Sequence, residues 1–178
     1  MTQSHAVAAP AKPLLLERNG WVPNNPRLPV LIYPRAIAVK GNDPAALFEK
    51  TFNTNGWPPQ WRYGVYNYHH YHTQGHEVLG IAAGHARLML GGPQGHVLEV
   101  GPGDVLLLPA GTGHCNLESS DDFLVVGAYP PGQHADICRE APTTAQLAAI
   151  DALPFPDRDP VQGPDGSVRE YWVSQRRQ

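Results

Sequence analysis

Residues 70–77 read HYHTQGHE, and this stretch places two histidines and a glutamate close together, well before a further histidine, His114. Alternate residues of a strand point to the same face, so the side chains of His70 and His72 are predicted to project side by side. Two imidazoles that converge in this way are typical of a metal site. The stretch therefore predicts a metal centre to which Glu77 and His114 also contribute.

The chain between His72 and Glu77 is predicted to bend. The two residues are an odd number of positions apart, so a straight strand would send the carboxylate to the opposite face. Residues 73–75 supply the bend in this interpretation, because Gly75 can adopt positive φ and the hydroxyl of Thr73 can satisfy a local turn. Glu77 then returns to the side of the histidines.

The second half of the predicted centre lies in residues 103–114, which read GDVLLLPAGTGH. The order is that of a turn, a buried strand, a second turn and a ligand, His114. Three imidazoles and one carboxylate suit Fe, Mn, Ni, Cu or Zn better than Mg or Ca. With these ligands a divalent ion keeps about one positive charge, and a six-coordinate ion has positions open for water, dioxygen or a chelating substrate.

Both segments resemble the conserved motifs of the cupin superfamily. Residues 70–77, with Gly84 after them, are similar to the first motif, and residues 103–114 are similar to the second. One position departs from the pattern, because the Asn that usually comes four residues after the histidine of the second motif is here Asn116, two residues after it. In cupins the two motifs form facing strands of a small β-barrel and bind a metal. The resemblance implies four ligands: His70, His72, Glu77 and His114.

The resemblance extends to a bacterial group of small cupins called YjlB-like. It rests on residues 23–26, 57–59, 69–80 and 125–129 and would cover most of the chain. That group has no settled activity, so the resemblance defines the fold and the metal site but not the substrate. A single motif pair implies one barrel rather than two, and cupins of this kind are commonly homodimers.

Three further residues are candidates for a catalytic role: His76, Tyr66 and Tyr68. Strand parity places Tyr66 and Tyr68 on the face of His70 and His72, where they either fill the core or hydrogen-bond a substrate oxygen. His76 adjoins the bend, and it is either a turn residue or an acid or base at the rim of the site.

Other polar residues near the motifs are predicted to lie outside the site. By parity, His69 faces away from the ligand pair. Arg87 could hold a substrate carboxylate, but it alternates with apolar residues, so an inward apolar face makes it a solvated surface charge. Cys115 follows His114 directly and is expected to face the other way, as a core or surface thiol.

The composition argues against nucleic-acid and membrane partners. The formal net charge is -3 without a basic run, whereas phosphate contacts require clustered Lys and Arg. No apolar stretch has the length of a signal peptide or a membrane span. The 2 cysteines are too few for a disulfide framework. We therefore predict a cytoplasmic protein whose partner is a small-molecule ligand or substrate.

The 178 residues are predicted to form a single all-β domain, a cupin barrel of the double-stranded β-helix or jelly-roll type with a few short flanking helices. Residues 1–29 form an N-terminal arm, residues 30–129 the barrel core, and residues 130–178 a C-terminal helix and tail. Strand signals separated by Gly-rich turns recur over residues 62–129, and the first strand is expected within residues 30–39.

Two helices are predicted outside the strands. The first begins at Asp43-Pro44, with Asp43 or Asn42 as cap, and places Phe48 and Phe52 on one face. The second runs over residues 144–153. In the tail, the aromatic pair at residues 171–172 is expected to dock on the barrel or on a second subunit.

Three functions fit these features. The first is a metal-dependent enzyme that acts on a small oxygenated organic molecule, as an oxidoreductase of the dioxygenase type or as an isomerase. The second is a module that binds or senses a sugar-like molecule without catalysis. The third is a structural protein with a vestigial metal site. The intact ligand set favours the first two, and the absence of a DNA-binding helix pair weakens an autonomous regulator.

Overall fold

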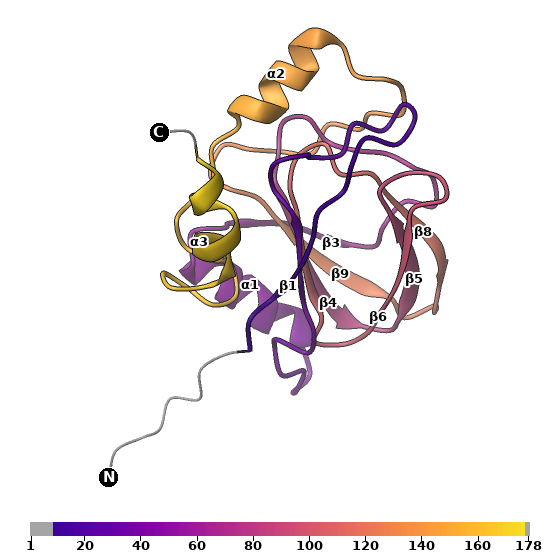
Figure 1. Ribbon diagram of the computed structural model, residues 1–178. Helices are drawn as coiled ribbons and strands as arrows, with labels where there is room; N and C mark the ends of the chain where they lie inside the picture. Colours follow the sequence, from indigo (N-terminus) through magenta and orange to yellow (C-terminus); the bar gives the residue numbers. More distant parts are fainter. Residues whose placement is uncertain (1–8, 177–178) are drawn as a thin grey trace.

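The computed structural model describes residues 9–176, which fold into two antiparallel sheets with short helices around them (Figure 1). The larger sheet has 6 strands in the order β1 (Lys12–Leu14), β2 (Val30–Tyr33), β7 (Val105–Leu108), β4 (Glu77–Ala83), β9 (Leu124–Ala128) and β3 (Pro59–Tyr63). The smaller sheet has 3 strands in the order β6 (His96–Val100), β5 (Ala86–Leu90) and β8 (His114–Ser119). The helices are α1 (Pro44–Thr54), α2 (Thr144–Ala152), α3 (Ser167–Tyr171) and the 3-10 helix η1 (Val173–Gln175). Across residues 9–176, no helix combines the length and apolar character that crossing a lipid bilayer requires. The predicted all-β fold is confirmed.

The larger sheet buries apolar side chains on both faces. Val78 of β4 packs outward into a core that includes side chains of α1 and α3. Leu79 and Ile81 of the same strand pack inward against the smaller sheet, in one cluster with Leu88 of β5. Because side chains alternate along a strand, Glu77 shares the inward face of Leu79 and Ile81. The first residue of β4 therefore directs its carboxylate to the interior between the sheets.

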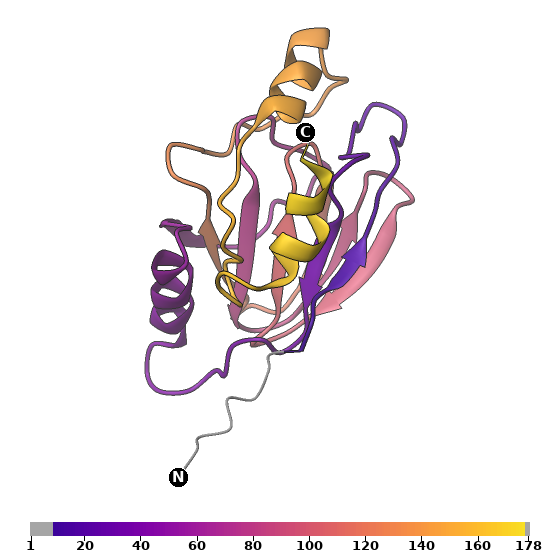
Figure 2. The same ribbon diagram turned by 60° about the vertical axis from the view of Figure 1, so that its left-hand side comes forward.

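Helix α1 begins as predicted, with Pro44 in its first turn, and packs on the outer face of the larger sheet (Figure 2). Phe48 and Phe52 are fully buried, with ring centroids 6.2 Å apart. Asp43 occupies the N-cap position, one of the two positions predicted, but its side chain makes no capping hydrogen bond. Its carboxylate instead pairs with the guanidinium of Arg62 in β3, 3.0 Å away.

The C-terminal segment docks on the barrel, and helix α2 lies beyond one end of the sheets in both views (Figures 1 and 2). A capping box starts α2, since Thr143 and Gln146 each accept a hydrogen bond from the backbone of the other. Trp172 is fully buried, and its indole donates to the carbonyl of Pro29 over 2.8 Å. Of the two docking sites expected for this ring, the structure therefore selects the barrel.

The N-terminal arm contributes a strand that the sequence pattern did not predict. Strand β1 pairs with β2, and the side chains of Val22 and Leu28 are buried. Strand β2 ends at Tyr33, earlier than the expected limit at Val39. Residues 1–8 of the predicted arm lie outside the described residues.

Candidate metal centre

Three histidines from the two sequence motifs meet in the structure. The ring centroids of His70 and His114 are 4.1 Å apart, and that of His72 lies 5.0 Å from that of His114. One possible ligand atom from each of the three residues lies within 4.8 Å of the other two, and all three residues are buried. The structure thus brings the three predicted histidines together.

Backbone pairing, rather than a regular strand, aligns His70 with His114. His70 lies outside the strands and forms an isolated antiparallel bridge with His114, whose N–H donates to the carbonyl of His70 over 2.9 Å. The neighbouring Tyr71 forms a second bridge, with Cys138. The predicted strand at this position is therefore wrong. The bridges nevertheless extend the chain, so alternation still directs His70 and His72 to one side.

Each of the three imidazoles donates its Nδ1 proton to a backbone carbonyl. The donor and acceptor pairs are His70 with Tyr68 at 2.8 Å, His72 with Asp136 at 2.6 Å and His114 with Thr112 at 2.9 Å. Because a carbonyl oxygen only accepts, Nδ1 carries the proton in each ring, and the neutral ring keeps a lone pair on Nε2. In this tautomer Nε2 can bind a metal, while a hydrogen bond holds Nδ1 in place.

Glu77 supplies the oxygen atoms of the predicted donor set. Its buried carboxylate lies 3.4 Å from Nε2 of His72 and 3.4 Å from Nε2 of His114. Burial raises the pKa of Glu77, but the attraction of the two histidines outweighs burial and holds this pKa well below its ordinary value. A buried carboxylate requires a positive partner, and a divalent cation meets that need. The residues present therefore fit a metal ion.

His70 and His72 differ in their affinity for a proton. Burial, and then the neighbouring His114, lower the pKa of His70 to about 2. Burial also acts to lower the pKa of His72, but the carboxylate of Glu77 outweighs it and raises this pKa. His72 and Glu77 are thus the part of the cluster that attracts positive charge most strongly.

Asp136 fixes the bend that follows His72. Its carboxylate accepts hydrogen bonds from the N–H groups of Thr73 and Gln74, at 2.8 and 3.0 Å, and from the Thr73 hydroxyl, at 2.5 Å. The backbone carbonyl of Asp136 also accepts the Nδ1 proton of His72. One loop residue therefore holds both the turn of the chain and the orientation of the imidazole.

Gly75 serves the bend for a different reason from the one predicted. It is not among the described glycines with positive φ. A Cβ atom at this position would lie 2.7 Å from the carbonyl oxygen of His134 and 2.9 Å from the ring of Tyr129. The close approach of another segment, and not an unusual turn geometry, requires glycine here.

Trp61 and Tyr129 position the carboxylate of Glu77. The Tyr129 hydroxyl donates to Oε2 of Glu77 and accepts a hydrogen bond from the indole N–H of Trp61 over 2.8 Å. Burial, and then the charge of Glu77, raise the pKa of Tyr129, so the hydroxyl keeps its proton for this bond. Trp61 pairs with Gly127 in the sheet, where a Cβ atom would lie 2.1 Å from the indole. Glycine at 127 thus makes room for the ring.

A cavity of about 460 Å³ opens onto this cluster, and its polar lining includes His70, His72 and Glu77. Tyr66 also lines it and is 41% exposed. Tyr68 is not among the described residues that line the cavity; its ring stacks on that of Tyr66, with centroids 5.1 Å apart. Of the two phenols predicted to point inward, the structure brings Tyr66 to the cavity and leaves Tyr68 behind it.

His76 is fully buried, but the structure does not bring it to the cavity. Its Nδ1 accepts a hydrogen bond from the N–H of Ala110 at 2.9 Å, and its Nε2 donates to the carbonyl of Leu153 at 3.2 Å. The ring packs against Phe155 and Trp172, with centroids 5.8 and 5.1 Å away. Because both nitrogens are engaged, the geometry favours a structural role over the predicted role of a rim acid or base.

The remaining polar residues near the motifs lie where the sequence placed them. Arg87 is exposed and pairs with Glu118 at 3.7 Å, as expected of a surface charge. Cys115 is a buried thiol, and burial raises its pKa. His69 is not part of the three-histidine group found among the described residues.

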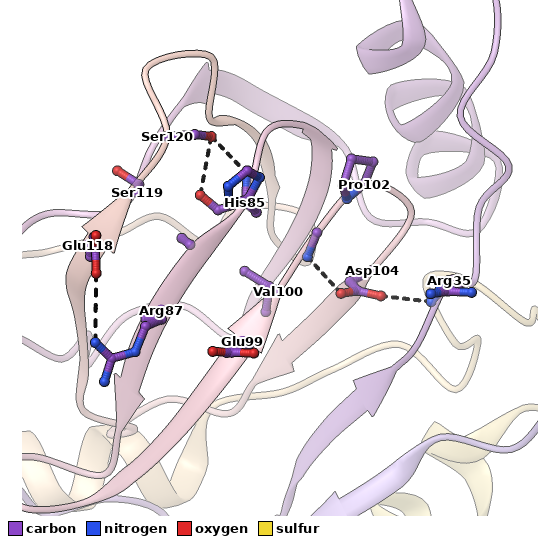
Figure 3. A pocket seen from close by; sticks show the side chains of 12 residues that line it. Arg35, His85, Arg87, Glu99, Val100, Pro102, Asp104, Glu118, Ser119 and Ser120 are labelled. Atoms are coloured by element: carbon purple, nitrogen blue, oxygen red, sulfur yellow. Dashed lines mark hydrogen bonds and ion pairs between the residues drawn. The ribbon is translucent and has the colours of Figure 1, made fainter.

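A larger cavity, of about 630 Å³, lies near the opposite end of strand β8 (Figure 3). Ser119 lines this cavity and ends the strand that His114 begins. Three of the charged side chains that line this cavity already have contacts: Arg87 pairs with Glu118, and the carboxylate of Asp104 accepts hydrogen bonds from two backbone N–H groups, each at 2.8 Å. Among the described residues, no group of metal donors lies there.

Three residues that shape the centre were not singled out from the sequence: Trp61, Tyr129 and Asp136. Tyr129 entered only through the family resemblance, although strand alternation from Val125 would have assigned it to the inner face. Asp136 lies in a loop without periodicity, so no local signal marks it. Sequence patterns therefore predicted the side chains that cluster but missed the residues that orient them.

Two facing antiparallel sheets, with three histidines and a glutamate brought together from two motifs, define a cupin. The chain is 36% identical over 157 residues to the Bacillus subtilis (strain 168) protein YjlB, which is uncharacterised, and the match covers 87% of this chain and 92% of that protein. The chain therefore belongs to the YjlB-like family of cupins, as the sequence motifs implied.

More distant comparisons add little. No model of a known protein family matches the chain. The solved structure of Streptomyces albus HEPD, with its substrate 2-hydroxyethylphosphonate and Fe(II) bound, is similar at a TM-score of 0.27 and 10% identity. The similarity covers 88% of this chain but about 30% of that longer one. A likeness this remote bears on neither the activity nor the substrate of the present chain.

Proposed function

We propose that this protein is a metal-dependent enzyme that acts on a small oxygenated organic molecule, as a dioxygenase or an isomerase. The ion is a divalent transition metal, one of Fe, Mn, Ni, Zn or Cu. The ligands in this proposal are His70, His72, Glu77 and His114. The observation that supports it most is the set of three Nδ1 hydrogen bonds to backbone carbonyls, since these leave three Nε2 lone pairs available to one cation.

A bound divalent ion supplies Lewis acidity and, if it is redox-active, the means to activate oxygen. The residues of the chain supply orientation. The Tyr66 side chain lines the cavity and can hydrogen-bond a substrate oxygen. Tyr68 acts through its carbonyl, which fixes the ring of His70. We leave His76 out of the proposed catalytic set, because neither of its nitrogens is free.

Elemental analysis of untagged protein, purified without chelator, tests the metal centre. We expect close to one transition-metal ion per chain, and loss of the ion in Glu77→Gln, because that variant removes the negative charge while it keeps the shape of the side chain. Glu118→Gln is the matched control, since Glu118 is exposed on β8 outside the cluster. Metal that survives in Glu77→Gln at the wild-type level would remove Glu77 from the ligand set.

Oxygen uptake distinguishes the two reaction types. Protein loaded with Fe(II) and supplied with small hydroxylated substrates consumes dioxygen if it is a dioxygenase, whereas an isomerase changes the substrate without uptake. Metal that binds stoichiometrically while every substrate returns unchanged would favour the alternative of a binding or sensing module.

The proposal also covers the domain organisation, location and oligomeric state of the enzyme. We treat residues 1–178 as one domain, which acts in the cytoplasm as a homodimer. Light scattering coupled to size exclusion measures the mass in solution, and a mass close to that of one 19.4 kDa chain would contradict the dimer.

A further inference from the structure

The cavity that opens onto the histidines and Glu77 is lined mainly by aromatic rings and aliphatic side chains. Trp61, Tyr63 and Tyr66 contribute aromatic surface, and Leu79 and Ile137 contribute aliphatic surface. Tyr63 and Tyr66 are 64% and 41% exposed. Large rings gathered at the mouth of a cavity are typical of a site that binds an apolar, flat molecule.

The tyrosine rings form a continuous row from the surface to His70. The centroid of Tyr66 lies 6.0 Å from that of Tyr63, 5.1 Å from that of Tyr68 and 5.5 Å from that of His70. The rings of Tyr66 and Tyr68 are parallel to within 11°. A planar molecule that enters the cavity therefore meets aromatic surface next to the proposed ligand His70.

The cavity offers no free cation to an anionic substrate. Arg62 is the one Lys or Arg among the described residues that line it. Its guanidinium is engaged by two carboxylates, since Asp43 binds Nη1 and Nη2 at 3.0 and 3.2 Å, and Glu49 binds Nη2 and Nε at 2.5 and 3.2 Å. Arg139 lies against the ring of Tyr68 rather than in the lining. A carboxylate or phosphate group would thus find no arginine to pair with.

The charge of the proposed centre sets a limit on the charge of the ligand. A divalent ion with three neutral imidazoles and the Glu77 carboxylate carries about one positive charge. A ligand that offers one ionised oxygen neutralises it. A phosphate or a dicarboxylate brings more negative charge into a buried site without a second cation, which desolvation opposes.

We infer that this cavity takes a planar aromatic compound that is uncharged in solution and releases one proton from a ring hydroxyl on binding, with its ring among Trp61, Tyr63 and Tyr66 and that oxygen facing His70, His72 and Glu77. The inference rests on the proposed function, because the oxygen requires the metal. The aromatic surface of the cavity, however, consists of side chains of this protein and does not depend on the metal.

Calorimetric titration of the metal-loaded protein tests the ligand class without measuring turnover. Catechol is the probe, and cis-1,2-cyclohexanediol is its counterpart with the same pair of oxygens and no aromatic ring. Inorganic phosphate and citrate represent the anionic class. We expect catechol to bind at least roughly tenfold more tightly than the other three, since it makes the ring contacts and can bind with only one of its two hydroxyl groups ionised.

Tyr66→Leu keeps an apolar side chain of similar reach and removes the ring. We expect it to weaken catechol binding roughly threefold to tenfold, with unchanged metal content. Leu117→Ala is the control, because Leu117 is an exposed residue of β8 that does not line the cavity. That variant is expected to bind catechol as the wild type does.

Metal analysis of each sample separates the two levels of the proposal. Stoichiometric metal together with tighter binding of phosphate or citrate than of catechol overturns the aromatic ligand class and leaves the metal centre intact. Equal binding of catechol by wild type and Tyr66→Leu also overturns it. Wild-type protein that takes up no metal overturns the proposed function and this inference together.

Discussion

His72 and His76 lie four residues apart in the sequence and are both buried, yet their surroundings differ in kind. The ring of His72 is bound through Nδ1 alone and turns Nε2 toward Glu77. The ring of His76 is bound through both nitrogens and packs between Phe155 and Trp172 of the C-terminal tail. Burial and a place in the motif are therefore not enough to define a ligand; a free nitrogen aimed at other donors is.

The difference arises from strand alternation at the start of β4. Glu77 points inward with Leu79, toward the histidine cluster, so its predecessor His76 points the other way, toward the tail. At the start of β4, the residue on the inner face thus belongs to the candidate site, and the residue on the outer face belongs to the core under the tail. Each prediction below changes one of the two surroundings and measures the property that depends on it, metal binding for the inner face and stability for the outer one.

The largest effect is expected on the metal content of two histidine variants, one from each of the two surroundings. His114→Ala removes one Nε2 donor, and we expect its metal content to fall below about a tenth of an ion per chain under chelator-free purification. His76→Gln preserves a donor and an acceptor and is expected to keep the wild-type content. Equal metal loss in both variants would show that the distinction between the two histidines is mistaken.

Trp172→Ala tests the outer environment alone. The indole is fully buried and donates to Pro29, so its removal should lower the free energy of unfolding by about 3–5 kcal/mol. Val97→Ala, at an exposed position of β6, should change it by less than about 0.5 kcal/mol. Urea denaturation of chelator-treated protein measures both. A Trp172→Ala protein as stable as the wild type would mean that the tail does not pack as described.

The pH dependence of stability sharpens the role of His76. Burial lowers the pKa of His76 from 6.5 to about 4. Between these values the unfolded chain binds a proton that the folded chain does not, so the free energy of unfolding falls as the pH drops from about 6.5 to about 4. The full contribution of this group is on the order of 3 kcal/mol.

His76→Gln removes this group from the titration. The stability gap between the wild type and the variant should therefore change across the same pH range, with the wild type losing more on acidification. Urea denaturation of chelator-treated samples at pH 7.5, 6, 5 and 4 (roughly the window in which the group titrates) checks it. Parallel pH profiles of the two proteins would refute the assignment of a buried neutral imidazole.

The smallest effect is expected for Asp136, which supports the inner environment and is not one of the four proposed ligands. Asp136→Ala removes the carboxylate bonds to Thr73 and Gln74 and loosens the carbonyl that orients His72. We expect metal affinity to weaken by about 10–100-fold, as for other residues that orient ligands. Competition with a chromophoric chelator measures the affinity. An unchanged affinity would show that the bend holds its shape without this carboxylate.

The sequence predicted the donors better than their supports, and the reason is physical. His70, His72, Glu77 and His114 lie in segments where alternation and turn residues leave a local pattern. Asp136 and Trp61 act across long sequence separations, through hydrogen bonds that depend on tertiary packing. No local periodicity encodes such contacts.

The fold shows the same division. Helix α1, helix α2 and the docking of Trp172 follow from local signals and were predicted. Strand β1 was missed, because its three residues form a strand only by pairing with β2. The strand expected around His70 proved to be two isolated bridges, since its pairing partners lie in β8 and in the loop near Cys138.

X-ray absorption at the edge of the bound metal tests the central claim most directly, because it counts the donor atoms and their distances. The account predicts three imidazole nitrogens and at least one carboxylate oxygen at about 2.0–2.2 Å. The imidazole signal should persist unchanged in His76→Gln. A first shell without imidazole nitrogen, or one dominated by sulfur at about 2.3 Å, would contradict the account.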